Sequence, residues 1–222
     1  MKLIISNICL TKPNLTTILF AFITSAILIG LVLLIHFQIQ IPIGRLTRDP
    51  VAIVEAPVYT GFFSQLGIFF WAFSAAICLF CALLMPKSEL RIKSFYFFSG
   101  LLVLLLGLDD IFLLHEVVFP FLGIPEKITL LTYVVLALIY GITFFTVILQ
   151  TDFILLVIAA LFFGISVGLD LSHITGINPY LWEDGAKMIG IVSWFSYLFR
   201  SAYCTFANLI NGEKSIEGKI IK

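Results

Sequence analysis

The chain has 222 residues, of which 61% are hydrophobic and only 12% are charged, and its mean hydropathy is +1.13. Ordinary soluble domains of this length are far less apolar, so this composition excludes them and indicates an integral membrane protein. Its 13 basic and 13 acidic residues cancel, which excludes the strongly basic surface that a nucleic-acid partner would need.

Six apolar runs reach the roughly 20 residues that a helix needs to cross a bilayer. Because these runs lack the alternation of a β-barrel, they predict helices. The first run is too long for the core of a signal peptide, so we expect it to be retained. The predicted fold class is therefore all-α, a polytopic bundle of six transmembrane helices. In chain order the runs lie near residues 15–37, 61–85, 95–119, 128–149, 153–175 and 183–208.

The distribution of lysine and arginine predicts the orientation, because cytoplasmic loops of membrane proteins are enriched in these residues. Both termini are predicted to be cytoplasmic, with segments 1–14 and 209–222 flanking a membrane domain at 15–208 in the plasma (inner) membrane. The connection at 38–60 would then lie outside. The cytoplasmic side would hold Lys2, Lys12, Lys87, Arg91, Lys93, Arg200, Lys214, Lys219 and Lys222, and the other side Arg45, Arg48, Lys127 and Lys187.

The informative residues are the ionisable side chains inside the apolar runs. An acidic or basic residue at a helix centre costs about 2.5–3.5 kcal/mol on insertion scales, so it predicts a functional site. The stretch LGLDDIFLLHE at 106–116 alone carries three carboxylates. With a rise of about 1.5 Å per residue, the ionisable groups of three helices form a column open to the extracytoplasmic side. They are Asp109, Asp110, His115, Glu116, Asp170, His173, Glu183, Asp184 and Lys187.

Four of these residues are the predicted metal ligands. Asp170 and His173 are three residues apart, the spacing of the Glu-x-x-His ligand pairs in carboxylate-bridged metal bundles. Glu116 and His115 lie at a similar predicted depth. Because a mixed oxygen and imidazole set suits zinc, iron or manganese, the predicted cofactor is a divalent ion of this kind.

The remaining polar residues are assigned to catalysis and to charge balance. Glu183 is predicted to be a further metal ligand or the general base, and Asp109 with Asp110 would exchange protons near the midplane. We expect the low dielectric there to keep Asp109 protonated. Lys187 is predicted to pair with one of three carboxylates, which are Asp184 three residues before it, Glu183 four residues before it, and Asp170 at the same predicted depth. Ion pairs that only fix helix packing are the structural alternative for the same residues.

Three functions are compatible with this pattern. The first is a metal-dependent, hydrolase-like membrane enzyme that acts on a lipid or on a small extracytoplasmic substrate. The alternatives are a proton- or cation-coupled transporter or relay, and a structural membrane subunit. In each case the expected partner is the lipid bilayer and not a nucleic acid, and no pattern indicates an oligomeric state.

Overall fold

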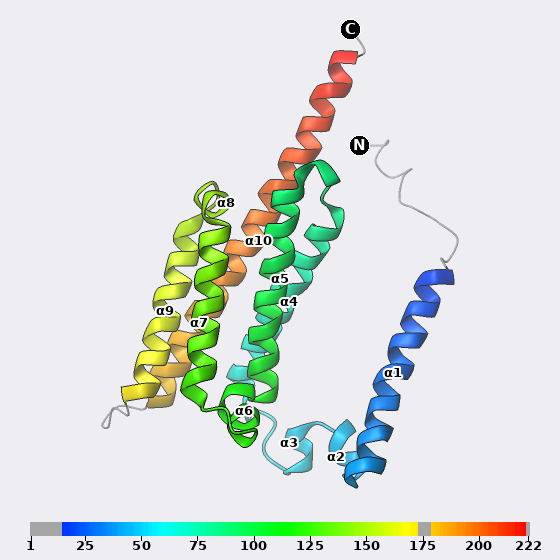
Figure 1. Cartoon of the computed structure of the whole chain (residues 1–222), viewed down its shortest axis with the longest axis vertical. Helices are drawn as coiled ribbons and strands as arrows, with labels where there is room; N and C mark the ends of the chain where they lie inside the picture. The colour runs from blue at the N-terminus through cyan, green and yellow to red at the C-terminus, as the bar shows by residue number, and fades with distance from the viewer. Residues whose placement is uncertain (1–14, 173–178, 221–222) are drawn as a thin grey trace. The chain divides into compact units, whose positions relative to one another are not determined.

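A computed structural model describes residues 15–172 and 179–220 of the chain (Figure 1). These residues form helices joined by short connections, and no strand occurs within the described ranges. The predicted all-α fold class is confirmed. The chain divides into two compact units, residues 1–60 and 61–222, and each is described by itself.

The first unit consists of one long helix and two short ones. Helix α1 (Leu15–Ile39) contains a candidate membrane span, Ile18–Ile39, with a mean hydropathy of 2.9 and no residue buried inside the protein. A helix that is apolar around its whole circumference matches hydrocarbon. After it come α2 (Ile43–Thr47) and α3 (Pro50–Ile53), whose first turn is capped by the Asp49 carboxylate.

The second unit is a bundle of five long helices. Helix α5 packs along α4, α10 packs along both α9 and α4, and α7 lies against α5 (Figure 1). The long helices are α4 (Phe62–Leu84), α5 (Leu90–Phe112), α7 (Glu126–Thr143), α9 (Phe153–Ser172) and α10 (Pro179–Ile220), and the short segments are η2 (Lys87–Glu89), η3 (Leu114–Val118), α6 (Phe119–Phe121) and α8 (Phe145–Leu149).

Glycines bring α4 and α5 together. A Cβ atom on Gly100 would lie 2.8 Å from Leu79, and one on Gly107 would lie 2.9 Å from Trp71. Only residues without a side chain fit at these two crossings, which is the usual role of small residues between transmembrane helices. The close approach places Trp71 of α4 beside the end of α5.

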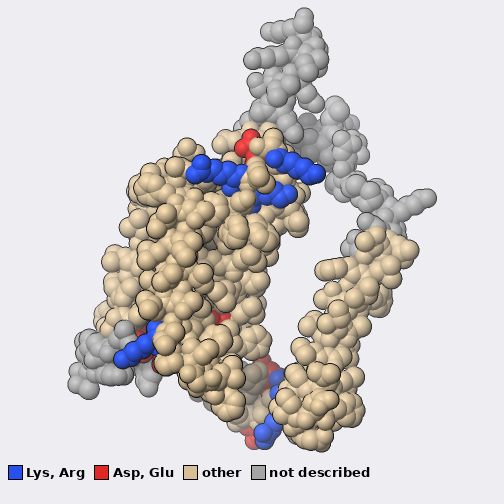
Figure 2. All heavy atoms as spheres, viewed as in Figure 1, with Lys and Arg blue, Asp and Glu red and all other residues tan. Residues whose placement is uncertain are grey.

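Within the described residues, five helices are long and apolar enough to cross a membrane, which indicates a membrane protein. The candidate spans are Ile18–Ile39, Phe62–Leu84, Lys87–Phe112, Glu126–Thr143 and Phe153–Asp170. Figure 2 shows a broad uncharged belt on the second unit between charged ends, which fits a helical bundle surrounded by lipid.

The sixth predicted span, 183–208, falls inside α10, which is not among the five candidates. Serines, tyrosines and charged residues lower its hydropathy. Its apolar side chains, including Trp194, Tyr197 and Leu198, are instead buried in the hydrophobic core of the bundle. A helix that packs largely against protein does not need the uniformly apolar surface of a lipid-facing one.

The third predicted span differs most from the structure, which breaks the continuous helix expected over 95–119. Helix α5 ends at Phe112, Leu113 adopts a left-handed backbone with φ of 50°, and the chain continues as a wider helical turn, η3. For a residue other than glycine this conformation costs about 1–2 kcal/mol. A specific interaction must therefore support the break, and it lies in the site described next.

Candidate functional site

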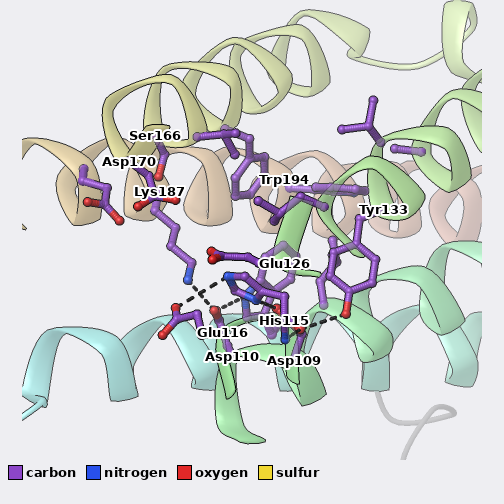
Figure 3. A pocket seen from close by; sticks show the side chains of 18 of the residues that line it. Asp109, Asp110, His115, Glu116, Glu126, Tyr133, Ser166, Asp170, Lys187 and Trp194 are labelled. Carbon is purple, nitrogen blue, oxygen red and sulfur yellow. Dashed lines mark hydrogen bonds and ion pairs between the residues drawn. The ribbon is translucent and has the colours of Figure 1, made fainter. Parts of the chain in front are cut away.

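A cavity of about 270 Å³ lies at the end of the second unit where α5 breaks (Figure 3). Helices α4, α5, α7, α9 and α10 and the turn η3 all contribute to its wall. Seven of the predicted site residues meet here, although they come from three separate parts of the chain. The ionisable residues that line the cavity are Asp109, Asp110, His115, Glu116, Glu126, Asp170, Glu183 and Lys187.

Asp109 is buried, with 5% exposure, and is surrounded by hydrogen-bond donors. One carboxylate oxygen accepts the main-chain N–H of His115 at 2.9 Å and the hydroxyl of Tyr133 at 2.8 Å. The other oxygen lies 2.5 Å from Nδ1 of His115. Two donors therefore meet at one oxygen, and the imidazole contacts the other. The protonated Asp109 expected from depth alone stays a prediction.

The same carboxylate explains the break after α5. Because Leu113 turns the backbone, the His115 N–H points back to Asp109 and not to a carbonyl of the preceding helix. Asp109 thus stabilises the turn and orients the imidazole of His115 at the same time. Residues 109 and 115 of the LGLDDIFLLHE stretch therefore form one structural element.

Asp110 ties three helices together. Its carboxylate forms an ion pair with Lys187 of α10, and it accepts a hydrogen bond of 2.8 Å from the indole N–H of Trp71 on α4. Consecutive residues on a helix point about 100° apart, so Asp110 faces α4 and α10 while Asp109 faces α7. Lys187 is thus paired with Asp110, which is none of the three predicted partners, Asp184, Glu183 and Asp170.

The cavity carries an excess of negative charge. Glu116 lies 3.5 Å from Nε2 of His115. Glu126, Asp170 and Glu183 have no ion-pair partner within the described part of the chain. Six carboxylates therefore share the cavity with one lysine and one histidine.

His115 lies beyond the spanning part of α5, and its protonation is set by its neighbours. The hydrogen bond to the Asp109 carboxylate raises the pKa of His115 above its usual value, while partial burial acts in the opposite direction. Its side chain is 14% exposed, and Nε2 faces Glu116 at the cavity. The ring is therefore held at one nitrogen and available at the other.

Comparison with known proteins places the chain in a family. The model of a domain of unknown function (DUF8692) matches residues 19–201, well over half of the sequence. The chain belongs to this family. No curated protein and no solved structure shows significant similarity to it. The matched DUF8692 segment includes every residue that lines the charged cavity.

Three residues of this DUF8692 site, Trp71, Glu126 and Tyr133, were not predicted from the sequence. Glu126 lies two residues before the predicted span at 128–149 and therefore outside it. The available signal was Pro125, because proline followed by an acidic residue is typical of a helix start. Trp71 and Tyr133 are polar only at the tip of an aromatic ring, and nothing in their local sequence distinguishes them from packing residues.

The predicted metal ligands are only partly brought together. Glu116, His115 and Asp170 line one cavity, whereas His173 lies outside the described residues. Among residues 15–172 and 179–220, no three His, Cys, Asp or Glu side chains are grouped closely enough to hold a metal ion. Nδ1 of His115 is occupied by Asp109, so only Nε2 is free to act as a ligand.

Proposed function

We propose that the protein is a membrane-embedded, hydrolase-like enzyme in which His115 is the general base. The observation that carries this proposal is the pairing of Asp109 with Nδ1 of His115, at 2.5 Å, on the wall of a cavity. A carboxylate in this position fixes the tautomer and orientation of the ring and stabilises the imidazolium that forms when the other nitrogen accepts a proton.

The proposed chemistry is a proton transfer at Nε2 of His115. The imidazole removes a proton from water, the oxygen attacks the substrate, and the imidazolium then returns the proton to the leaving group. Asp109 stays ionised throughout and is a positioning residue. Glu116, 3.5 Å from Nε2, is placed to pair with the imidazolium once Nε2 has accepted the proton.

Lys187 would support the same reaction. Its ammonium has three donors, of which the ion pair with Asp110 leaves others available, and the residue lines the cavity. A fixed cation in a partly buried site stabilises negative charge that develops on a substrate oxygen. Asp110, which accepts a hydrogen bond from Trp71, holds this lysine in place.

The deciding experiment is turnover by the purified protein. A panel of acyl esters, acyl amides and phosphodiesters with hydrocarbon chains would be presented in detergent micelles, and wild type would be compared with His115→Gln. Hydrolysis of at least one class that depends on His115 supports the proposal. Hydrolysis of none, or equal rates for both proteins, would contradict it.

A metal-dependent form is the second candidate, because the same geometry fits a carboxylate–histidine–metal arrangement. Asp109 would orient His115, and Nε2 together with Glu116, Asp170 and His173 would hold zinc, iron or manganese, where the ion would supply an activated water. Glu183 would then be the base.

Elemental mass spectrometry of protein purified without chelator or a nickel column tests this second candidate. We expect about one transition-metal ion per chain in wild type if it holds, and a clear reduction in Asp170→Ala. A content far below one ion per chain would leave His115 as a metal-free base. Glu89→Ala, at the opposite end of the bundle, is the matched control.

We further propose that α10 is the sixth span and that both termini are cytoplasmic, with 15–208 forming the membrane domain between segments 1–14 and 209–222. The basic residues of the α4–α5 turn, including Lys87 and Arg91, support a cytoplasmic location for that end. The charged cavity would then open to the extracytoplasmic side of the plasma (inner) membrane.

Cysteine labelling tests this orientation. In a cysteine-free background, Thr47→Cys is expected to react with an impermeant maleimide on intact cells, whereas Ser88→Cys should react only after permeabilisation. The reverse pattern would place the cavity on the cytoplasmic side.

A further inference from the structure

A second, apolar cavity of about 490 Å³ lies between α7 and α9 and adjoins the charged cavity. The side chains that line this apolar cavity are hydrocarbon or aromatic. The hydroxyl among them, that of Tyr140, bonds to Ser99. A molecule that occupied both cavities would have a polar end and an apolar end. The residues shared by the two walls are Val134, Ala137, Phe163, Val167 and Trp194.

Small residues keep this apolar cavity open. Gly141 on α7 and Gly164 on α9 line it, together with Ala137 and Ala160. In membrane bundles such residues usually allow close helix contact, as Gly100 does between α4 and α5. Here the opposite holds, because a Cβ atom added to Gly141 or Gly164 would meet nothing within 4 Å. The small residues therefore provide space for an apolar chain.

The charged end selects for a cation. Asp110 is paired with Lys187, and Asp109 is hydrogen-bonded to His115 and Tyr133. Among the described residues, the other four carboxylates have a single contact with a basic group, that of Glu116 with His115. An anionic or neutral head group would leave this excess charge uncompensated, whereas an ammonium group would compensate part of it and donate hydrogen bonds.

We propose that the two cavities together bind a single-chain amphiphile whose head group carries a protonated amine. The hydrocarbon chain would lie between α7 and α9, and the amine would lie among Glu116, Glu126, Asp170 and Glu183. This inference rests on the proposed function only in taking the bound molecule to be the substrate. Binding itself is independent of turnover.

The test uses quenching of tryptophan fluorescence by a brominated chain in detergent micelles. The full-length protein would carry Trp182→Phe, which removes an exposed tryptophan and leaves Trp71 and Trp194 at the cavities. We expect saturable quenching by 12-bromododecylamine. The half-quenching concentration of 12-bromododecanol, which differs only in its head group, should be at least about tenfold higher.

Variants separate the apolar chain site from the bulk micelle. Gly164→Leu fills the apolar cavity and should weaken amine binding about tenfold or more, since it displaces two or more methylenes of the ligand. Gly168→Leu is the matched control: it lies on the same helix, also with open space around its Cβ, but outside both cavities. Gly141→Leu decides the matter if Gly164→Leu does not fold.

The head-group claim has its own variant. Glu126→Gln combined with Glu183→Gln should reduce the preference for the amine over the alcohol. Equal quenching by the two probes in wild type would overturn the proposal. So would wild-type binding in both Gly164→Leu and Gly141→Leu, because the chain would then lie only in bulk detergent.

The outcomes distinguish this inference from the proposed enzyme. His115→Gln should bind the brominated amine within about threefold of wild type even though its turnover is lost. Turnover that depends on His115, with no selective amine binding, would remove the amphiphile inference alone. Selective binding without turnover that depends on His115 would remove the enzyme proposal alone.

Discussion

Replacement of His115 by glutamine is expected to lower kcat by about 10²–10⁴-fold against the best substrate of the amphiphile panel, the usual contribution of a general base. Glutamine retains a hydrogen-bonding group of similar length, but it cannot accept a proton at neutral pH. Because Asp109 and Tyr133 remain in place, the fold should persist, and KM should change much less than kcat.

The pH profile gives a second readout of the same residue. A general base must be unprotonated, and the Asp109 carboxylate raises the pKa of His115 above its usual value near 6.5. Activity of wild type should therefore fall as the pH drops through a value above 6.5, and this limb should be missing from the residual activity of His115→Gln. His36→Gln, the same substitution at the end of α1, should leave both rate and profile unchanged. A His115→Gln rate within threefold of wild type would show that the histidine is only structural.

Replacement of Asp110 by leucine is expected to destabilise the protein by about 3 kcal/mol, the lower end of the range for a broken buried ion pair. The lower end applies because the Lys187 side chain keeps 36% exposure, whereas that of Asp110 keeps only 11%. The substitution leaves an ammonium and the indole N–H of Trp71 without their acceptor. Unfolding in detergent, followed by loss of helical circular dichroism, measures the change.

The double variant shows whether the pair or the aspartate alone matters. Asp110→Leu with Lys187→Met removes both charges, so it should recover most of the lost stability. Asp152→Leu, which breaks the exposed pair with Arg200, is the matched control and should have little effect. A double variant as unstable as Asp110→Leu alone would mean that the lost bond to Trp71 of α4, and not the lost ion pair to α10, causes the destabilisation.

The sequence is sufficient to predict that the charged residues lie together, because this follows from the lipid that surrounds the helices. Lipid penalises each ionisable group so strongly that Asp109, Asp110, Asp170, Glu183 and Lys187 have to share an interior, whichever way the helices are connected. The membrane character and the all-α class follow from the same argument. The roles of these residues do not follow from it. Ion pairs that only fix helix packing would gather in the same interior as the residues of a functional site.

The details that sequence reasoning missed depend on contacts between distant residues. Nothing local marks Leu113 as the end of α5, since leucine favours helix continuation and the break is stabilised by Asp109. Depth alone suggested a protonated Asp109, but the groups that contact its carboxylate include the hydroxyl of Tyr133, 24 residues away, which no local pattern indicates. Lys187 had an acceptable partner within its own helix, and only the packing of α10 against α4 and α5 shows that it reaches Asp110.

Asp109 accepts hydrogen bonds from both the main chain and the side chain of one residue, His115. A movement that withdraws the imidazole from the carboxylate therefore strains the turn at Leu113, and unwinding of the turn likewise withdraws the imidazole. Both changes break hydrogen bonds to the same carboxylate, so we expect the turn and the imidazole to move together. The position of the ring at the charged cavity is thereby coupled to the end of helix α5.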